Sequence, residues 1–122
     1  MRVLVKQKNL SLTPSIRSYI DSKLVRPVKK ILEQAAREDL PILEIEIART
    51  TLHHRKGLVF YAEANLSAGK SLIRVEAEDI DIHAAIDVLK DELLGRLTAL
   101  KDKRTVVGRK RARVLKKKLR EG

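Results

Sequence analysis

Apolar residues recur at helical spacing across residues 76–103, EAEDIDIHAAIDVLKDELLGRLTALKDK. The apolar stripe comprises Ile82, Ile86, Leu89, Leu93, Leu97 and Leu100, at steps of three and four residues. At about 3.6 residues per turn, such steps place every member on one face of a helix. Asp81 precedes the stripe and can cap the helix, because its carboxylate can accept hydrogen bonds from backbone N–H groups of the first turn. On a helical wheel Asp87, Asp91 and Thr98 form an outward crest, so the stretch predicts a long amphipathic helix.

A second helical pattern begins near the N-terminus. Thr13 is a suitable N-cap, and Pro14 suits the first helical position, where its missing N–H removes no hydrogen bond. The apolar stripe of this helix comprises Ile16, Ile20, Leu24, Val28 and Ile31. Pro27 would remove a hydrogen bond inside the helix. We therefore expect a kink or a short break at Pro27, with helix resuming to about Arg37.

Strand patterns fill much of the remaining chain. Residues 2–6 form a short, mainly apolar run and are predicted to be the first strand. Three later runs have apolar residues at every second position, which predicts three further strands. Their inward residues are predicted to be Leu43, Ile45 and Ile47, then Leu58, Phe60, Ala62, Ala64 and Leu66, then Ile73, Val75 and Ala77. The element order predicts an α+β fold, a β-α-β-β-β-α two-layer sandwich. Its four-stranded sheet would carry both helices side by side on one face.

The charge of the chain is concentrated at its C-terminal end. The net charge is +11, and residues 101–122 supply +9 of it, with 11 basic and 2 acidic side chains, whereas residues 1–100 hold 16 basic and 14 acidic ones. Such an excess favours an anionic partner, with nucleic acid as the leading candidate. We expect an α+β domain at residues 1–104 and a basic, flexible tail at residues 105–122, disordered or weakly helical. The chain holds only three aromatic residues, which argues against stacking on successive bases.

Basic side chains recur on both predicted helices. On the first helix Lys23, Arg26 and Lys30 lie on a face beside the apolar stripe. On the second, Lys90 and Lys101 flank one edge of the stripe, and Arg96 and Lys103 flank the other. The basic tail adds Arg104, Arg109, Lys110 and Arg111. A charged helix face is often merely solvated, but side by side the two helices could border a shared basic groove.

Catalytic and metal-binding motifs are weak in this sequence. There is no cysteine, which excludes disulfides, thiolate metal sites and cysteine nucleophiles. Residues 64–71, ANLSAGKS, match the loosest phosphate-loop pattern, yet a strand pattern follows where a helix is required, so a hairpin turn is the better interpretation. His53 and His54 lack partners at zinc-ligand spacing. We therefore expect no enzyme, cofactor, bound metal or small-molecule substrate.

Further acidic and histidine side chains have ordinary structural interpretations. The acidic residues Glu76, Glu78, Asp79 and Asp81 fit a solvated edge better than a cation site. His83, beside the apolar stripe of the long helix, fits a core edge better than catalysis. No signal core or membrane-length apolar run is present, so the expected location is the cytoplasm, with no membrane partner.

Two motifs in this order resemble the ribosome hibernation promoting factors, also called ribosome-associated inhibitor or sigma-modulation proteins. KNLSLTPSIRSYIDSKL and AEDIDIHAAIDVLKDELLGRL correspond to the family's Lys-Asn, its Leu-Thr-Pro helix start and its Asp-x-x-Ala-Ala-Ile-Asp helix. The similarity extends over roughly residues 1–104. It implies a β-α-β-β-β-α fold similar to double-stranded RNA-binding domains. Departures from the family pattern are Pro27, the longer segment at residues 32–40, and a body with a net charge of only +2.

The resemblance implies a non-enzymatic stress-response factor that is monomeric off the ribosome. Such a factor would bind 16S rRNA at the decoding region of the small ribosomal subunit, regulate translation by occluding the mRNA and tRNA sites, and use basic residues of both helices. The long family members carry a separate C-terminal dimerisation domain, which we do not expect here. Two alternatives are a generic nucleic-acid-binding protein driven by its basic tail, and a protein–protein regulator of transcription.

Overall fold

The computed structural model describes the backbone of residues 1–33, 40–51 and 57–121, and the side chains of these ranges as far as residue 101. Eight elements follow one another along the chain. They are β1 (Arg2–Lys8), α1 (Pro14–Ile20), the π-helical segment η1 (Asp21–Val25), α2 (Arg26–Glu33), β2 (Ile42–Arg49), β3 (Phe60–Ala68), β4 (Ser71–Asp79) and α3 (Ile82–Glu121). The strands form one sheet in the order β1-β2-β3-β4, with β1 and β2 parallel and the other pairs antiparallel.

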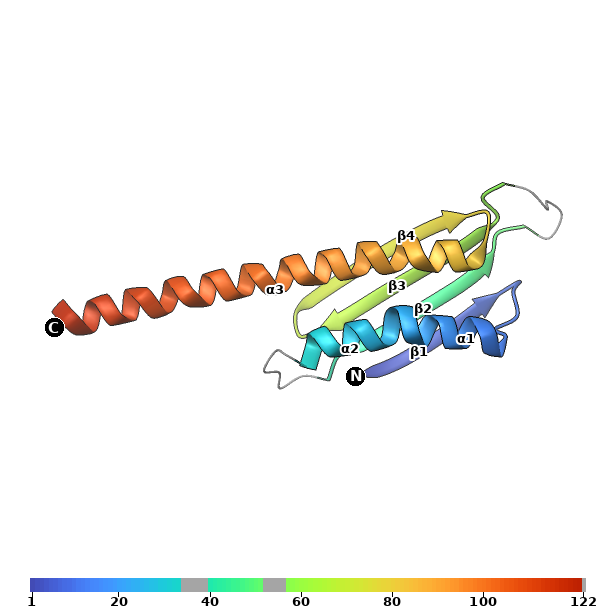
Figure 1. The fold of residues 1–122 in the computed structure, drawn as a ribbon. Helices are drawn as coiled ribbons and strands as arrows, with labels where there is room; N and C mark the ends of the chain where they lie inside the picture. The colour runs from blue at the N-terminus through green and yellow to red at the C-terminus, as the bar shows by residue number, and fades with distance from the viewer. Residues whose placement is uncertain (34–39, 52–56, 122) are drawn as a thin grey trace.

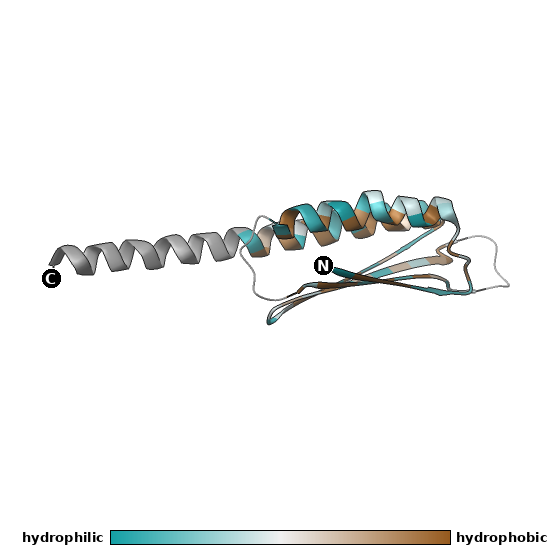
Figure 2. Ribbon diagram, turned by 90° about the horizontal axis from the view of Figure 1, so that it is seen from below, coloured by the Kyte–Doolittle hydropathy of each residue, from teal (hydrophilic) through white to brown (hydrophobic). Residues whose placement is uncertain are grey.

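Both helical stretches lie on the same face of the sheet, side by side (Figure 1). Seen edge-on, the molecule has one layer of helices and one of strands (Figure 2). The core lies between the layers, where the stripe of α3 meets alternate residues of the strands. Fully covered positions include Leu24, Leu43, Ile47, Leu89 and Leu93. The predicted α+β sandwich is confirmed.

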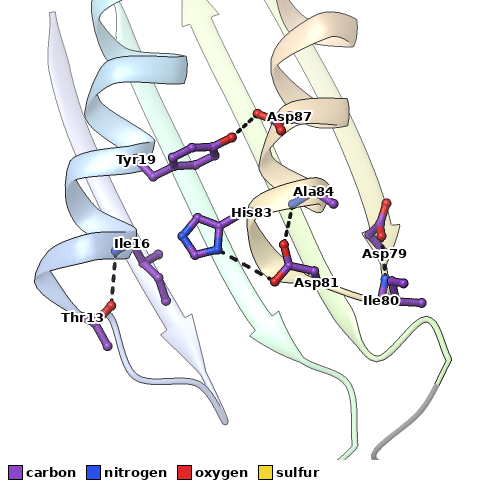
Figure 3. Close-up of polar contacts among 9 residues, drawn as sticks. All are labelled: Thr13, Ile16, Tyr19, Asp79, Ile80, Asp81, His83, Ala84 and Asp87. Carbon is purple, nitrogen blue, oxygen red and sulfur yellow. Dashed lines mark hydrogen bonds and ion pairs between the residues drawn. The ribbon is translucent and has the colours of Figure 1, made fainter.

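Caps and turns place the helices at the ends of the strands. Asn9, in the turn after β1, has a φ of 56°, a left-handed conformation that asparagine tolerates better than most residues. Thr13 Oγ1 accepts a hydrogen bond from the Ile16 N–H at 3.2 Å, and Asp81 Oδ2 accepts one from the Ala84 N–H at 3.1 Å (Figure 3). Both predicted N-caps are confirmed.

The first helical stretch does not break at Pro27. A π-helical turn, η1, comes just before it, in which the Arg26 N–H donates to the carbonyl of Asp21 five residues back. The buried side chains of this stretch are Ile16, Ile20, Leu24, Val28 and Leu32. On a regular α-helix, residues four apart are about 40° out of line, so a row of residues spaced by four gradually winds around the helix. The extra residue of the π turn offsets part of that drift and buries Leu32. Ile31, the last residue of the predicted stripe, is half-buried and packs against the core.

Two further boundaries differ from the sequence prediction or lie outside the structure. α2 ends at Glu33, and the predicted continuation to Arg37 lies outside the described residues. Leu58 was expected to face the core but is 60% exposed, because β3 begins only at Phe60. Val59 is buried in its place, and its carbonyl accepts a hydrogen bond from the Thr50 N–H at 2.7 Å.

The long helix α3 continues well past the sheet (Figure 1). Its backbone is helical without interruption to Glu121, so no change of structure marks the proposed boundary at residue 104. The sequence predicted that the basic tail is either disordered or weakly helical, and its backbone is helical. Whether the tail is a unit distinct from residues 1–104 stays a prediction.

Core burial predicts a sharp contrast between two leucines. Leu24→Ala should lower the free energy of unfolding by about 2–5 kcal/mol, because Leu24 is fully buried and its truncation leaves a cavity. Leu58→Ala removes the same atoms from an exposed side chain and should change stability by less than about 0.5 kcal/mol. Urea unfolding followed by circular dichroism measures both. Equal losses for the two variants would contradict this account of the core.

Candidate nucleic-acid interface

The outward side of the first helical stretch is basic. Residues 14–33 hold five basic side chains against two acidic ones, Asp21 and Glu33. The basic residues are Arg17, Lys23, Arg26, Lys29 and Lys30, of which Lys23 is half-buried and the others are exposed. Lys23, Arg26 and Lys30 were predicted from the sequence, whereas Arg17 and Lys29 were not. Arg17 lies about 120° around the helix from Lys23 and lines a hollow beside Val3 and Val5 of β1. The cations of this stretch are suited to phosphate groups.

Two of these cations have contacts on the helix surface. Lys23 Nζ lies 5.6 Å from the centroid of the Tyr19 ring, within the range of a cation–π interaction. Arg26 Nε lies 2.8 Å from Asp21 Oδ2, and the Arg26 side chain is 75% exposed. An exposed ion pair of this kind holds its partners weakly. The Arg26 guanidinium is therefore still accessible to a phosphate.

A polar contact joins the two helical stretches. The Tyr19 hydroxyl donates to Asp87 Oδ1 at 2.5 Å, and the Tyr19 ring meets His83 edge-on, with centroids 4.8 Å apart (Figure 3). His83 Nδ1 lies 3.8 Å from the capping carboxylate of Asp81. The hydrogen bond to Asp87, together with partial desolvation and the Asp87 and Asp81 charges, raises the pKa of Tyr19. This contact fixes how α1 and α3 lie against each other.

The position of Asp87 corrects the sequence analysis. Asp87 was assigned to the outward crest of the long helix with Asp91 and Thr98, but it is half-buried and faces the first helical stretch. Asp91 and Thr98 are exposed, as predicted. Asp87 does lie on the polar side of its own helix, as the wheel indicates. The first helical stretch, which packs beside α3, covers this part of that side. His83 is half-buried at the edge of the core, as predicted.

The basic residues of α3 fall on two separate sides. Lys90 lies seven residues after His83 and three after Asp87, so it shares their side of the helix, toward the first helical stretch. Arg96 lies at the other edge, where its Nη1 donates to the backbone carbonyl of Arg74 on β4 at 2.9 Å. The structure therefore brings Lys90 toward the cations of the first stretch and places Arg96 away from them.

The remaining predicted site residues lie along the C-terminal part of α3. Lys101 is half-buried and belongs to the same side of the helix as Lys90. Lys103, Arg104, Arg109, Lys110 and Arg111 belong to the helical backbone of α3, and their side chains lie outside the described ones. Their part in an interface stays a prediction.

The motifs weighed in the sequence have ordinary positions where the structure describes them. Residues 64–71 run along β3, turn at Gly69, whose φ is 61°, and enter β4, so the hairpin interpretation is confirmed. His53 and His54 lie outside the described residues. Over the described ranges, no three potential metal-ligating side chains come together. No helix there has the length and apolarity that crossing a membrane requires.

A family profile described as sigma 54 modulation protein / S30EA ribosomal protein matches residues 3–105. The chain belongs to this family. The matched span contains β2, β3, β4 and all of β1 except Arg2, together with the first helical stretch and the sheet-covering part of α3, so the contact between Tyr19 and Asp87 lies within the S30EA domain.

Similar proteins carry names that refer to the ribosome. A protein of Picosynechococcus sp. named ribosome hibernation promotion factor is 29% identical over 103 residues, which are 84% of this chain and 50% of the relative. This S30EA chain thus spans about half the length of that relative. The crystal structure of the Thermus thermophilus protein Y N-terminal domain has a TM-score of 0.61 at 24% identity, covering 82% of this chain and 99% of the other. A ribosomal subunit interface protein from Coxiella burnetii has a TM-score of 0.59 at 20% identity, covering 84% and 99%. These two structures share the fold.

The contact between Tyr19 and Asp87 predicts a measurable stability effect in this S30EA domain. Tyr19→Phe removes the hydroxyl and should lower the free energy of unfolding by about 1 kcal/mol at pH 7. In the wild type this contribution is present below the ordinary tyrosine pKa of 10.0 and declines as pH rises through the higher folded-state pKa, because the folded state holds the proton more tightly.

A double-mutant cycle with Asp87→Ala, which removes the acceptor oxygen, gives the coupling between the two side chains. Urea unfolding at pH 7 and above pH 10 measures it. The difference between wild type and Tyr19→Phe should shrink at the higher pH. A coupling of zero at pH 7 would mean that the hydrogen bond does not join the helices in solution.

Proposed function

We propose that this S30EA-family chain binds the small ribosomal subunit at the decoding region, contacts 16S rRNA and occludes the mRNA and tRNA sites. It would act as a translation-inhibiting hibernation factor by binding and not by catalysis. Family membership and the ribosomal names of similar proteins support the ribosome as partner. The observation that carries the mode of binding is the basic side of the helix layer, where residues 14–33 hold five cations against two anions.

The arrangement suits backbone phosphates better than bases. Lys23, over the Tyr19 ring, and Lys90 lie on the sides of the two helices that are turned toward each other, while Arg26 and Lys30 extend the basic surface along the first stretch. Flexible cations on helices can follow the phosphates of a folded RNA, and the chain offers only three aromatic side chains for stacking. Residues 101–122, with a net charge of +9, would add affinity along the rRNA.

Neutralising the helix layer should weaken ribosome binding selectively. The variant Lys23→Gln, Arg26→Gln, Lys30→Gln removes three cations. The slope of log affinity against log salt, which is negative, should become less steep by about 2–3. The matched control is Arg2→Gln, Lys6→Gln, Lys8→Gln, which removes the same charge from exposed side chains on β1 that point away from the helices. Co-sedimentation with 30S subunits over a salt series measures both, and equal slopes would contradict a role for the helix layer.

Competition separates site occlusion from general attraction to polyanions. The full chain and a version ending at Arg104 are sedimented with 30S subunits, with and without mRNA and tRNA. Among the side chains that the structure describes, the buried core cluster extends from Ile16 to Leu97, and the shorter chain retains all of it. We expect saturation near one chain per subunit, displacement by mRNA and tRNA, and a lower salt slope for the shorter chain. Unsaturable binding of the full chain alone, indifferent to competitor, would instead indicate a polyanion binder driven by its tail.

A further inference from the structure

The sheet has a second face that the helices do not cover (Figure 2). Strand register identifies its residues, because the core residues Leu43, Ile45 and Ile47 alternate with the ones that point the other way. On β2, β3 and β4 this outer face carries five glutamates and one basic residue, Arg74. The glutamates are Glu44, Glu46, Glu63, Glu76 and Glu78. Basic residues of the same face, Arg2, Lys6 and Lys8, are confined to the edge strand β1.

Three of these glutamates stand in one row across neighbouring strands. Glu46 is in register with Glu63, and Glu63 with Glu76. Like charges in directly opposed positions destabilise a sheet. Arg74 relieves part of this repulsion, since its Nε lies 2.9 Å from Glu63 Oε1 and its Nη2 lies 2.9 Å from Glu76 Oε1. Glu46 is in register with Lys6 on β1, although no ion pair to Glu46 is found within the described ranges, and the three glutamates of the row outnumber Lys6 and Arg74 by one.

The same face has an apolar end. Leu4, Ile42 and Leu72 lie on it, and Leu72 is 68% exposed. A shallow hollow between Leu40, Ile42 and the β3–β4 turn lies at this end. Burial, together with the neighbouring Glu63 carboxylate, raises the pKa of Tyr61 on this face to about 12. A partner that suits the face would carry several cations and some aliphatic side chains.

The chain itself contains a segment of that chemistry. Residues 101–122 hold 11 basic and 2 acidic side chains, and also five aliphatic ones, Val106, Val107, Val114, Leu115 and Leu119. The helical residues 102–121 span about 30 Å at 1.5 Å per residue, close to the roughly 30 Å of a nine-residue strand. α3 lies on the helix side of its own sheet and continues in a straight line past the sheet's end, so residues 102–121 do not run along the outer face of the same molecule (Figure 1). They can reach the outer face of a second molecule.

We propose that the outer face of the sheet binds residues 101–122 of a second copy of this chain. Glu44, Glu46 and Glu78, which Arg74 does not pair, receive the cations, and the apolar end receives aliphatic side chains. This association replaces the monomeric state expected from the sequence. It also goes beyond rRNA binding, because rRNA and the acidic face compete for one basic segment. RNA should therefore dissociate the complex between copies.

Sedimentation equilibrium of the full chain tests the proposal at low and high salt. The sheet variant Glu44→Gln, Glu46→Gln, Glu78→Gln removes three carboxylates without touching the ion pairs of Arg74. The matched control Glu33→Gln, Asp91→Asn, Glu92→Gln removes three exposed carboxylates from the helix layer. We expect association of the wild type at low salt, weakened about tenfold by the sheet variant and unchanged by the control. A monomeric wild type at all concentrations, or equal weakening by both variants, overturns the proposal.

Zero-length cross-linking locates the contact in the unmodified chain. A carbodiimide joins lysine amines to nearby carboxylates, and mixing chains of two isotopic labels separates links between molecules from links within one. We expect mixed-label links between Lys116, Lys117 or Lys118 and Glu44, Glu46 or Glu78, and their loss when a short RNA is added. Links only to Glu33, Asp91 or Glu92, or links only within one molecule, contradict the proposal even if a variant fails to fold. Because this test contains no ribosome, its failure leaves the proposed ribosomal function unaffected.

Discussion

Packing of the α3 stripe against the sheet is the contact on which the arrangement of this molecule depends. Ile86, Leu89 and Leu93 are fully buried against the strands, so the helix cannot rotate about its axis without exposing them. Burying three large aliphatic side chains contributes on the order of 5–9 kcal/mol. That rotational setting places Lys90 toward the first helical stretch and Arg96 toward β4. Burial of the apolar stripe thus determines where the basic side chains of α3 lie.

Covering only one face of the sheet also separates the charges. Cations collect on the first helical stretch, while glutamates occupy the outer face of β2, β3 and β4. A polyanion that approaches the first helical stretch meets one unpaired carboxylate among the side chains described there, Glu33, since Asp21 is paired with Arg26, whereas α3 exposes Asp91 and Glu92. The small net charge of residues 1–100 therefore understates how basic the first helical stretch is. Net charge averages two faces that a partner meets separately.

The fold could be predicted because apolar periodicity reports burial directly in both helices and most strands. The details that could not be predicted depend on neighbours distant in sequence. Asp87 looked solvent-facing because its partner Tyr19 lies 68 residues away, and Arg96 looked available because its acceptor is a β4 backbone carbonyl. The sequence does contain a sign of the π turn, because buried apolar residues recur at every fourth position from Ile16 to Leu32. Residues of the candidate site could be predicted from their charge, but which of them lie on the facing sides of the two helices could be learned only from the tertiary structure.

The continuous backbone of α3 changes what the basic segment can do. A flexible chain samples many directions, whereas a helix directs its residues along one line at about 1.5 Å per residue. The stripe that sets the rotation of α3 over the sheet therefore also sets the direction in which residues 102–121 leave the body. Any anionic surface that binds the helix layer and this segment together must follow that line. Anions too short or too curved to do so can bind one of the two, and the remaining basic surface stays open to a second partner.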